Sequence, residues 1–302
     1  MVATAERGAV AVPTRRRAPM RRRQARTAFA FLAPALLFFA LLFFYPLARE
    51  LYTSLFTGAA ADRYTGLGNY TKAFGDPVAR HAFWVTVQYG LGVVVGAIVL
   101  GLVLAVILNQ RMRGRAVFRG ILLVPYLTSI AIVGLLWRNI LDPDTGVLNR
   151  VLHALGAPEQ NWLAEHPLAT IVCIAVWQQV GYTTVLFLAG LQGIPELYYE
   201  AAAVDGASVW HRFRHVTLPL LAPTTLFVSV IGVISAMQEF ALPYLVTQGG
   251  PNNASDLYVY QVWKTAFNFR DFGYASALSY LLLIVILVLS LIQLKVGQRG
   301  EK

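Results

Sequence analysis

The chain has 302 residues, of which 57% are hydrophobic and only 13% are charged, about half the charged share of an average soluble domain. Its formal net charge is +10, but eight of the 25 Lys and Arg lie in residues 1–26 and many others flank apolar runs, where cationic residues set membrane orientation. These properties exclude an ordinary soluble protein, argue against nucleic-acid binding, and indicate an all-α polytopic membrane protein.

Six apolar runs are long enough, or nearly so, to cross a bilayer as helices, which needs about 20 residues. We expect spans at about 28–48, 83–108, 120–140, 167–191, 220–246 and 272–294. They form a transmembrane domain over residues 28–302, preceded by a basic tail over residues 1–27. Pro125 predicts a kink in the third span. Gly92 and Gly96 form a G-x-x-x-G pattern in the second span, which predicts a close helix contact.

The distribution of basic residues predicts the orientation. If the N-terminus is inside, the inner segments hold 17 of the 25 Lys and Arg and the longer outer segments hold eight. The positive-inside rule therefore predicts that both termini are cytoplasmic. The first span is expected to be retained, because its apolar stretch is too long for a signal peptide and no small-residue cleavage site follows Tyr45-Pro46. The basic tail is expected to be disordered and near anionic headgroups.

A part-polar insert, residues 195–219, separates the fourth and fifth spans and is expected to face the cytoplasm. Pro195 fits the first position of a helix, and Glu196 favours the positive end of the helix dipole. The alanines at 201–203 favour continued helix. Asp205-Gly206 is expected to end it, because glycine tolerates the left-handed conformation that often closes helices.

Ser208 is expected to cap a second helix, so the insert is predicted to be a short helix–turn–helix lying against the membrane. Its first face has small side chains, namely Ala201, Ala202, Gly206 and Ala207. Trp210 and Phe213 form an aromatic pair at helical spacing. A small-residue face lets another protein approach closely, while the alternative is an amphipathic helix that packs on lipid headgroups. The physical pattern alone favours neither.

The insert resembles the EAA loop of bacterial ABC importer permeases, through Glu200-Ala201-Ala202, Asp205-Gly206-Ala207 and Leu218-Pro219. Other stretches are similar to the carbohydrate-uptake branch of that family, namely "FLAPALLFFALLFFYPLARELYTSLF" (31–56), "GLGNY" (66–70), "ILLVPYL" (121–127) and "LVTQGGPNNAS" (245–255). Within the branch, the chain is most similar to the first permease subunit of the maltose or glycerol-3-phosphate type. The resemblance implies a type I ABC importer permease fold with six transmembrane helices.

The resemblance also implies how the insert works. In the family this loop is the coupling helix, which docks in a cleft of a separate ATPase and transmits its closure to the membrane helices. The residues carried over to this joint are Glu200, Ala201, Ala202, Asp205, Gly206 and Ala207. Glu200 would be the polar contact, and Gly206 would allow the tight turn. The implied partners are a second permease subunit, two ATP-binding subunits, an extracytoplasmic solute-binding protein and membrane lipid, all at the bacterial cytoplasmic membrane.

The chain itself shows no sequence signal for an enzyme or a metal site. It has no phosphate loop of the G-x-x-x-x-G-K-[ST] kind, so ATP and Mg²⁺ are expected to be bound by the partner ATPase and no cofactor by this chain. The single cysteine, Cys173, allows no intrachain disulfide and no cysteine-based metal site. His211 and His215 have the spacing of metal ligands but lack an acidic neighbour to complete a set.

Polar side chains within two of the spans predict a substrate pathway. Such residues are costly in lipid and usually face the bundle interior or a cavity. The candidates are Gln178, Gln179, Tyr182, Ser235, Gln238 and Glu239. Amides, carboxylates and an aromatic ring suit a hydroxyl-rich solute, whereas the alternative is hydrogen bonding between spans. The resemblance leaves sugars, oligosaccharides, polyols and glycerophosphodiester or glycerol-3-phosphate-like solutes open. A phosphate-bearing solute would favour a basic group near the pathway, and Arg138 is the one candidate at a span end.

Three classes of function compete. The first is the transmembrane subunit of an ATP-driven, binding-protein-dependent importer, which the insert favours. The second is a stand-alone secondary transporter driven by an ion gradient, a class that usually shows repeats and broken helices. The third is a membrane subunit that transports nothing. The large external domain and extra spans of the maltose-type first permease have no counterpart in this sequence, so the resemblance is greater to the compact six-span members.

Overall fold

A computed structural model of the chain describes residues 22–58, 62–110 and 114–299. The chain divides into two compact units, one up to Glu50 and one from Leu51 onward. The basic tail expected over residues 1–27 lies outside the described residues as far as residue 21. The first unit contains α1 (Arg22–Phe39), the π-helical turn η1 (Ala40–Phe44) and most of α2 (Tyr45–Ser54). Its apolar side chains are exposed, as expected of a helix that faces lipid.

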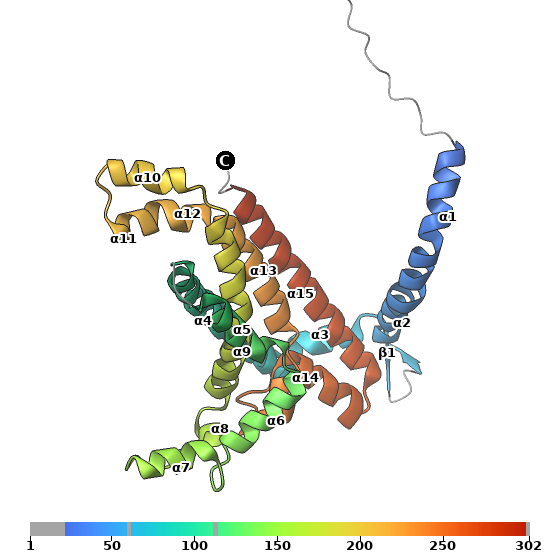
Figure 1. The fold of residues 1–302 in the computed structure, drawn as a ribbon. Helices are drawn as coiled ribbons and strands as arrows, with labels where there is room; N and C mark the ends of the chain where they lie inside the picture. The colour runs from blue at the N-terminus through green and yellow to red at the C-terminus, as the bar shows by residue number, and fades with distance from the viewer. Residues whose placement is uncertain (1–21, 59–61, 111–113, 300–302) are drawn as a thin grey trace, which may run out of the picture. The chain divides into compact units, whose positions relative to one another are not determined.

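The second unit is almost wholly helical (Figure 1). Its α-helices are α3 (Gly68–Gly75), α4 (Pro77–Asn109), α5 (Arg115–Leu127), α6 (Ile130–Ile140), α7 (Val147–Ala154), α8 (Trp162–Glu165), α9 (Pro167–Gln192), α10 (Glu196–Val204), α11 (Val209–Arg212), α12 (Leu218–Leu220), α13 (Ala222–Met237), α14 (Tyr258–Trp263) and α15 (Phe272–Arg299). Three π-helical turns join them, namely η2 (Phe213–Thr217), η3 (Pro243–Thr247) and η4 (Lys264–Asn268). One small antiparallel hairpin pairs β1 (Phe56–Thr57) with β2 (Arg63–Tyr64).

Four helices are long and apolar enough to cross a membrane, namely Thr27–Ser54, Pro77–Asn109, Pro167–Gln192 and Phe272–Gly297. Two further helix pairs pass the same test together but are sharply bent, so the described residues contain four candidate spans, or six if each bent pair counts as one. The all-α, multi-span architecture predicted from the apolar runs is confirmed.

The third predicted span, residues 120–140, is not one continuous helix. It is split into α5 and α6, whose axes differ by 92°. Thr128 and Ser129 leave the helical conformation, with ψ angles of 138° and 130°. Pro125 in the last turn of α5 has no backbone N–H to donate, which weakens the helix end. The break thus falls three residues beyond the expected kink at Pro125.

The fifth predicted span, residues 220–246, is also interrupted. Helix α13 ends at Met237, and the chain resumes a helical path only before η3. The carboxylate of Glu239 accepts the backbone N–H of Leu242 at 2.9 Å, which stabilises the start of the following turn. At its other end, α13 is bent by 61° from the segment Val209–Leu220. Helix α13 therefore has 16 residues, 11 fewer than the 27 of the expected span 220–246.

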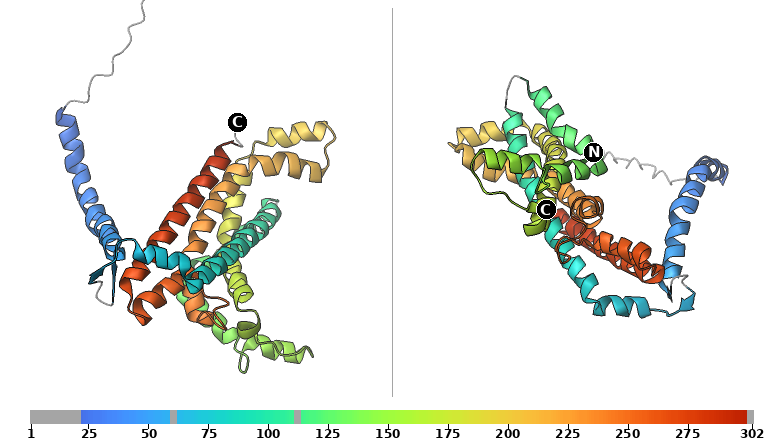
Figure 2. Two further views of the ribbon diagram at one scale, coloured as in Figure 1. Left: turned by 180° about the vertical axis from the view of Figure 1, so that it is seen from behind. Right: turned by 90° about the horizontal axis from the view of Figure 1, so that it is seen from below.

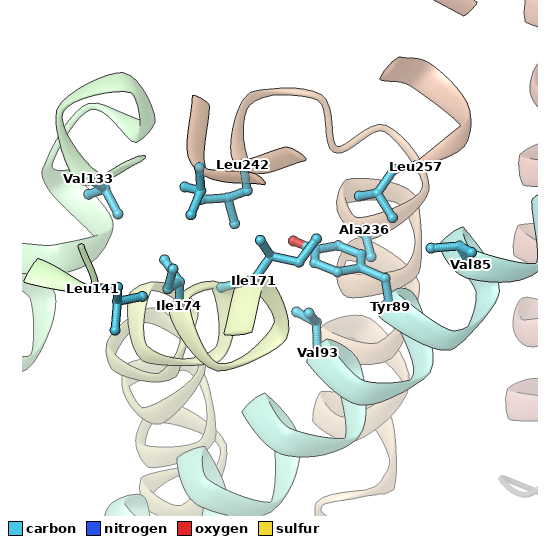
Figure 3. Packing of buried hydrophobic residues seen from close by; sticks show 12 residues of the cluster. Val85, Tyr89, Val93, Val133, Leu141, Ile171, Ile174, Ala236, Leu242 and Leu257 are labelled. Atoms are coloured by element: carbon cyan, nitrogen blue, oxygen red, sulfur yellow. The ribbon is translucent and has the colours of Figure 1, made fainter. Parts of the chain in front are cut away.

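The core of the second unit is the close pairing of α4 with α9. A Cβ added at Gly92 or Gly96 would meet Val172 or Val176 at 3.0 Å and 2.8 Å, which confirms the close contact predicted from the G-x-x-x-G pattern. Around this pair lies a cluster of buried apolar side chains (Figure 3). Tyr89 of α4 is fully buried in this cluster. This packing fixes the positions of α4, α9 and α13.

The two ends of this helical unit differ. The insert α10–α12 projects from one end, and the C-terminal end of α15 lies at that same end (Figures 1 and 2). The short helices α7 and α8 lie at the opposite end, beyond α6 (Figure 1). The polar insert, which joins α9 to α13, and the segment α7–α8, which joins α6 to α9, therefore lie at opposite ends of this unit (Figure 1).

Candidate functional site

A cavity of about 400 Å³ lies between α9 and α13. All six residues of the predicted substrate pathway line it, namely Gln178, Gln179, Tyr182, Ser235, Gln238 and Glu239. Gln178 and Tyr182 are one helical turn apart on α9 and so share a face. Ser235 lies near the end of α13, and the two residues after that helix turn into the cavity wall. The structure therefore brings together side chains that are about 60 residues apart in the sequence.

The broken third span completes the cavity. Tyr126 near the end of α5 stacks on Tyr182, with ring centroids 4.5 Å apart and planes at 7°. The side-chain amide of Gln178 points to the carbonyl oxygen of Thr128 at 3.4 Å, a long hydrogen bond at most. Ile130, just past the break, also lines the cavity. The 92° bend between α5 and α6 thus places a backbone carbonyl and an aromatic ring beside the polar face of α9.

Two aromatic residues of this cavity, Tyr126 and Phe240, were not among the predicted pathway residues. Both sit in apolar runs, where an aromatic side chain gives no sign of whether it faces lipid, core or cavity. A usable signal for Tyr126 is its place between a proline and the polar pair Thr128-Ser129 in an otherwise apolar stretch. Phe240 directly follows Gln238 and Glu239, two polar residues that interrupt an otherwise apolar run.

The chemistry of the cavity suits a neutral, hydroxyl-rich solute. Its polar groups are amides, hydroxyls and one carboxylate, and no Lys or Arg lines it among the residues with described positions. Amides and carboxylates together both donate to and accept from hydroxyl groups. The stacked tyrosines give a flat surface on which the apolar face of a ring can rest.

The second candidate site is the insert, whose local structure follows the prediction closely. Helix α10 runs from Glu196 to Val204 with Pro195 just before it. Gly206 adopts the left-handed conformation, with φ of +75°. The N–H of Ala207 donates to the carbonyl of Ala202 at 2.9 Å, and that of Gly206 to Ala203 at 3.0 Å, a closing motif typical of helix C-termini.

The second half of the insert begins at Ser208, whose hydroxyl accepts the N–H of His211 at 3.2 Å and so caps α11, as predicted. The hydroxyls of Tyr199 and Thr217 lie 3.1 Å apart. Thr217 is buried at the end of the π-helical turn η2, which leads through α12 to α13. This hydrogen bond therefore connects α10 to the segment that precedes α13.

The small-residue face of the insert is open. Glu200, Ala201, Asp205 and Gly206 are exposed, whereas Ala202 and Ala207 are half-buried. A Cβ at Gly206 would meet no atom within 4 Å among the described residues. Four of the six residues carried over from the EAA loop are therefore open to another molecule on this part of the chain, and the other two are partly covered.

The two residues of the aromatic pair, Trp210 and Phe213, differ in solvent exposure. Trp210 and Phe213 stack at 5.6 Å, but Trp210 is 67% exposed whereas Phe213 is half-buried. Both line an apolar groove of about 940 Å³ together with Ile98, Leu102 and Val106 of α4. Phe213 thus contributes to holding the insert on its own chain, and Trp210 contributes less than the sequence suggested.

His211 and His215 lie with ring centroids 4.0 Å apart. One ring nitrogen of His215 is 3.1 Å from the backbone carbonyl of His211. Over residues 22–58, 62–110 and 114–299, no group of three or more His, Cys, Asp or Glu side chains is placed to hold a metal ion. The pair therefore finds no third ligand in that part of the chain.

Comparison with known proteins finds a matching family model and several relatives. The family model described as "Binding-protein-dependent transport system inner membrane component" matches residues 97–299. A probable ABC transporter permease protein of Brucella suis is 35% identical over 91% of this chain and 97% of its own length. The arabinooligosaccharides transport system permease protein AraP of Bacillus subtilis is 35% identical over 89% of this chain and 88% of its own.

A further relative is the sn-glycerol-3-phosphate transport system permease protein UgpA of Agrobacterium fabrum, 30% identical over 88% of this chain and 93% of its own. Among solved structures, the crystal structure of a bacterial alginate ABC transporter in complex with an alginate pentasaccharide-bound periplasmic protein contains a chain that superposes with a TM-score of 0.79. It is 21% identical and covers 92% of this chain and 96% of its own. At that identity the likeness concerns the fold, which is that of an ABC importer permease.

Proposed function

Because the chain belongs to the family of binding-protein-dependent transport system inner membrane components, we propose that it forms half of the translocation pathway of an ATP-driven importer for a neutral sugar or oligosaccharide. As a permease of this family it is a multi-pass protein of the bacterial inner membrane. The observation that carries the substrate class is the cavity between α9 and α13, with its amides, its single carboxylate and its stacked tyrosines.

The choice of a neutral solute over a phosphate-bearing one rests on charge. A buried anion is costly unless it is paired, and the one charged side chain at the cavity is the carboxylate of Glu239 among the described lining residues. That carboxylate would repel a phosphate. Of the relatives, AraP is named for arabinooligosaccharides and UgpA for glycerol-3-phosphate; the charge of the cavity supports the former kind of solute.

The energy source is a separate ATPase that binds ATP and Mg²⁺. Its contact is the exposed face of the insert, through Glu200, Ala201, Ala202, Asp205, Gly206 and Ala207. The hydrogen bond between Tyr199 and Thr217 supports a direct transmission from this face to α13. We propose one such chain, a second permease subunit, two ATPase subunits and an extracytoplasmic solute-binding protein as the working assembly.

We propose that the insert and both chain ends face the cytoplasm. The C-terminal end of α15 lies at the same end of the bundle as the insert (Figure 2), which supports this arrangement together with the excess of basic residues in the expected inner segments.

A stand-alone secondary transporter is the alternative, and the broken helix α5–α6 beside the cavity is a feature that such proteins also show. Family membership favours the importer. The deciding experiment is reconstitution of the purified complex in proteoliposomes with the cognate binding protein. We expect an ATPase to co-purify and uptake to require ATP. Uptake driven by an ion gradient without ATP, or a binding protein specific for glycerophosphate, would contradict the respective part of the proposal.

A further inference from the structure

A further hollow, smaller than the cavity between α9 and α13, is lined by residues of α6, η3 and the segment α14–η4. Helices α6 and α14 lie away from the end of the unit that carries the insert (Figure 1). The volume of the hollow is about 330 Å³. Its lining combines aromatic and polar side chains, namely Arg138, Tyr244, Gln248, Tyr260, Trp263 and Asn268. None of these residues belongs to the predicted pathway or to the coupling surface, and the hollow is separate from the cavity between α9 and α13.

The aromatic side chains that line the hollow pack on one another. Tyr244 meets Trp263 edge-on at 5.2 Å, and Tyr260 stacks on Trp263 at 6.0 Å. Tyr260 is only 7% exposed. Interfacial aromatic belts place their rings at the lipid headgroups, whereas these rings pack on each other and line a polar hollow. Rings fixed in this way lose little entropy when a ligand stacks on them.

The polar groups of the hollow are available for a ligand. Arg138 makes no hydrogen bond and no ion pair within 4 Å among the described residues. Its charge acts on the nearby carboxylate of Asp142, which accepts the backbone N–H and the hydroxyl of Thr145, each at 2.8 Å. Gln248 has a left-handed backbone with φ of +51°, a conformation that is uncommon for a residue other than glycine and is often found at functional sites.

An aromatic contact joins this hollow to the larger cavity. Phe240 lines the cavity between α9 and α13. Its ring stacks on Tyr244 of the hollow at a centroid distance of 5.1 Å and an angle of 18°. One stacked pair of rings therefore joins the wall of the cavity to the wall of the hollow.

We propose that this hollow is an outer glycosyl-binding subsite, which receives the leading ring of a sugar before the ring reaches the cavity between α9 and α13. This proposal rests on the proposed function. The face of a pyranose or furanose ring is apolar and suits the aromatic surface of Trp263 and Tyr244. Its hydroxyls suit the amides of Gln248 and Asn268 and the forked donors of Arg138.

The test uses the complete transporter in proteoliposomes with its sugar-loaded binding protein at saturation. Uptake of radiolabelled arabinotriose, maltotriose and raffinose is measured together with the ATPase rate that the loaded binding protein stimulates. Trp263→Ala and Tyr244→Ala are expected to lower uptake about tenfold, while the stimulated ATPase rate stays within about twofold. Trp263→Phe, which keeps an aromatic surface, is expected to recover most of the uptake. Phe269→Ala, an exposed aromatic residue outside the hollow, is the matched control and is expected to change neither rate.

Each outcome has a distinct meaning. If Trp263→Ala and Tyr244→Ala transport as well as the unchanged protein, or if uptake and stimulated ATPase fall together, the subsite is overturned and the proposed function stands. If the unchanged complex takes up none of the three sugars although its binding protein is loaded with them, or if loaded binding protein does not stimulate its ATPase, the proposed function fails, and the subsite fails with it. A higher ratio of ATP hydrolysed to sugar transported in the alanine variants alone supports the subsite.

Discussion

The insert and the cavity between α9 and α13 are built in opposite ways. The insert is specified within 25 consecutive residues by a helix start, a left-handed glycine at Gly206 and a capping serine at Ser208. The cavity takes its lining from several separate stretches of the chain, including α5, α9 and the end of α13. The proposed coupling surface is thus a local, exposed structure, whereas the proposed binding surface depends on packing between distant stretches of the chain.

The largest effect is expected from a bulky side chain on the proposed coupling surface. Gly206→Trp adds a large side chain where a left-handed backbone disfavours any Cβ and where we propose that the ATPase approaches closely. We expect a loss of about 3 kcal/mol in ATPase docking, equal to about a hundredfold in affinity. The measurement is the amount of ATPase that co-purifies, together with the rate stimulated by loaded binding protein.

Gly206→Asn is the matched control, because asparagine tolerates the left-handed conformation better than most residues. It is expected to keep most of the coupling. Coupling at the unchanged level in the tryptophan variant would show that this surface does not contact the ATPase.

A change of charge in the cavity should affect transport and leave coupling intact. Glu239→Gln keeps the shape and the acceptor for the Leu242 N–H but removes the carboxylate, which hydrogen-bonds a hydroxyl more strongly than an amide does. We expect sugar uptake to fall about tenfold, with ATPase co-purification unchanged. Glu165→Gln, an exposed site outside the cavity, is the control. Equal loss of uptake in both variants would remove Glu239 from the pathway.

The packing between α5 and α9 gives a third, purely structural effect. A Cβ at Gly181 would overlap the carbonyl oxygen of Leu122, whereas one at Gly120 would meet no described atom within 4 Å. Gly181→Ala is therefore expected to destabilise the protein by about 1–3 kcal/mol, and Gly120→Ala to change its stability little. Thermal unfolding of the purified complex measures the difference. Equal melting temperatures would mean that α5 does not pack on α9 as closely as described.

The smallest expected effect concerns the hydrogen bond between Tyr199 of the insert and Thr217, which precedes α13. Tyr199→Phe removes the hydroxyl that bonds Thr217 and should cost about 0.5–1.5 kcal/mol. We expect ATPase to co-purify as before while uptake per ATP hydrolysed falls modestly. Phe213→Leu, which changes packing but not this hydrogen bond, serves for comparison. If the two variants have the same uptake per ATP, the hydrogen bond has no special part in transmission.

These differences also explain how far the sequence alone could predict the molecule. The insert was predictable because helix starts, caps and left-handed glycines act over a few residues. The six polar cavity residues were predictable because a polar group in an apolar run needs a partner away from lipid. Tyr126 and Phe240 were not predicted, because an aromatic side chain in an apolar run can face lipid, the core or a cavity.

The break of the third span shows a different limit. Pro125 indicated a disturbance, but the 92° turn at Thr128-Ser129 depends on how α6 packs on η3, where Gly134 lets Leu245 approach to 3.0 Å of an added Cβ. The outer hollow was likewise not foreseen, since its walls come from α6, η3 and α14. No local pattern reports such long-range contacts.

We propose that motion produced by a separate ATPase enters this chain through the exposed face of α10, on the cytoplasmic side. The most direct test is labelling of a single thiol, Asp205→Cys, after the only native cysteine has been replaced as Cys173→Ser. In intact cells a membrane-impermeant maleimide should leave this thiol unlabelled, and in the purified complex a short bifunctional reagent should link it to the ATPase. Labelling from outside in intact cells would contradict the account.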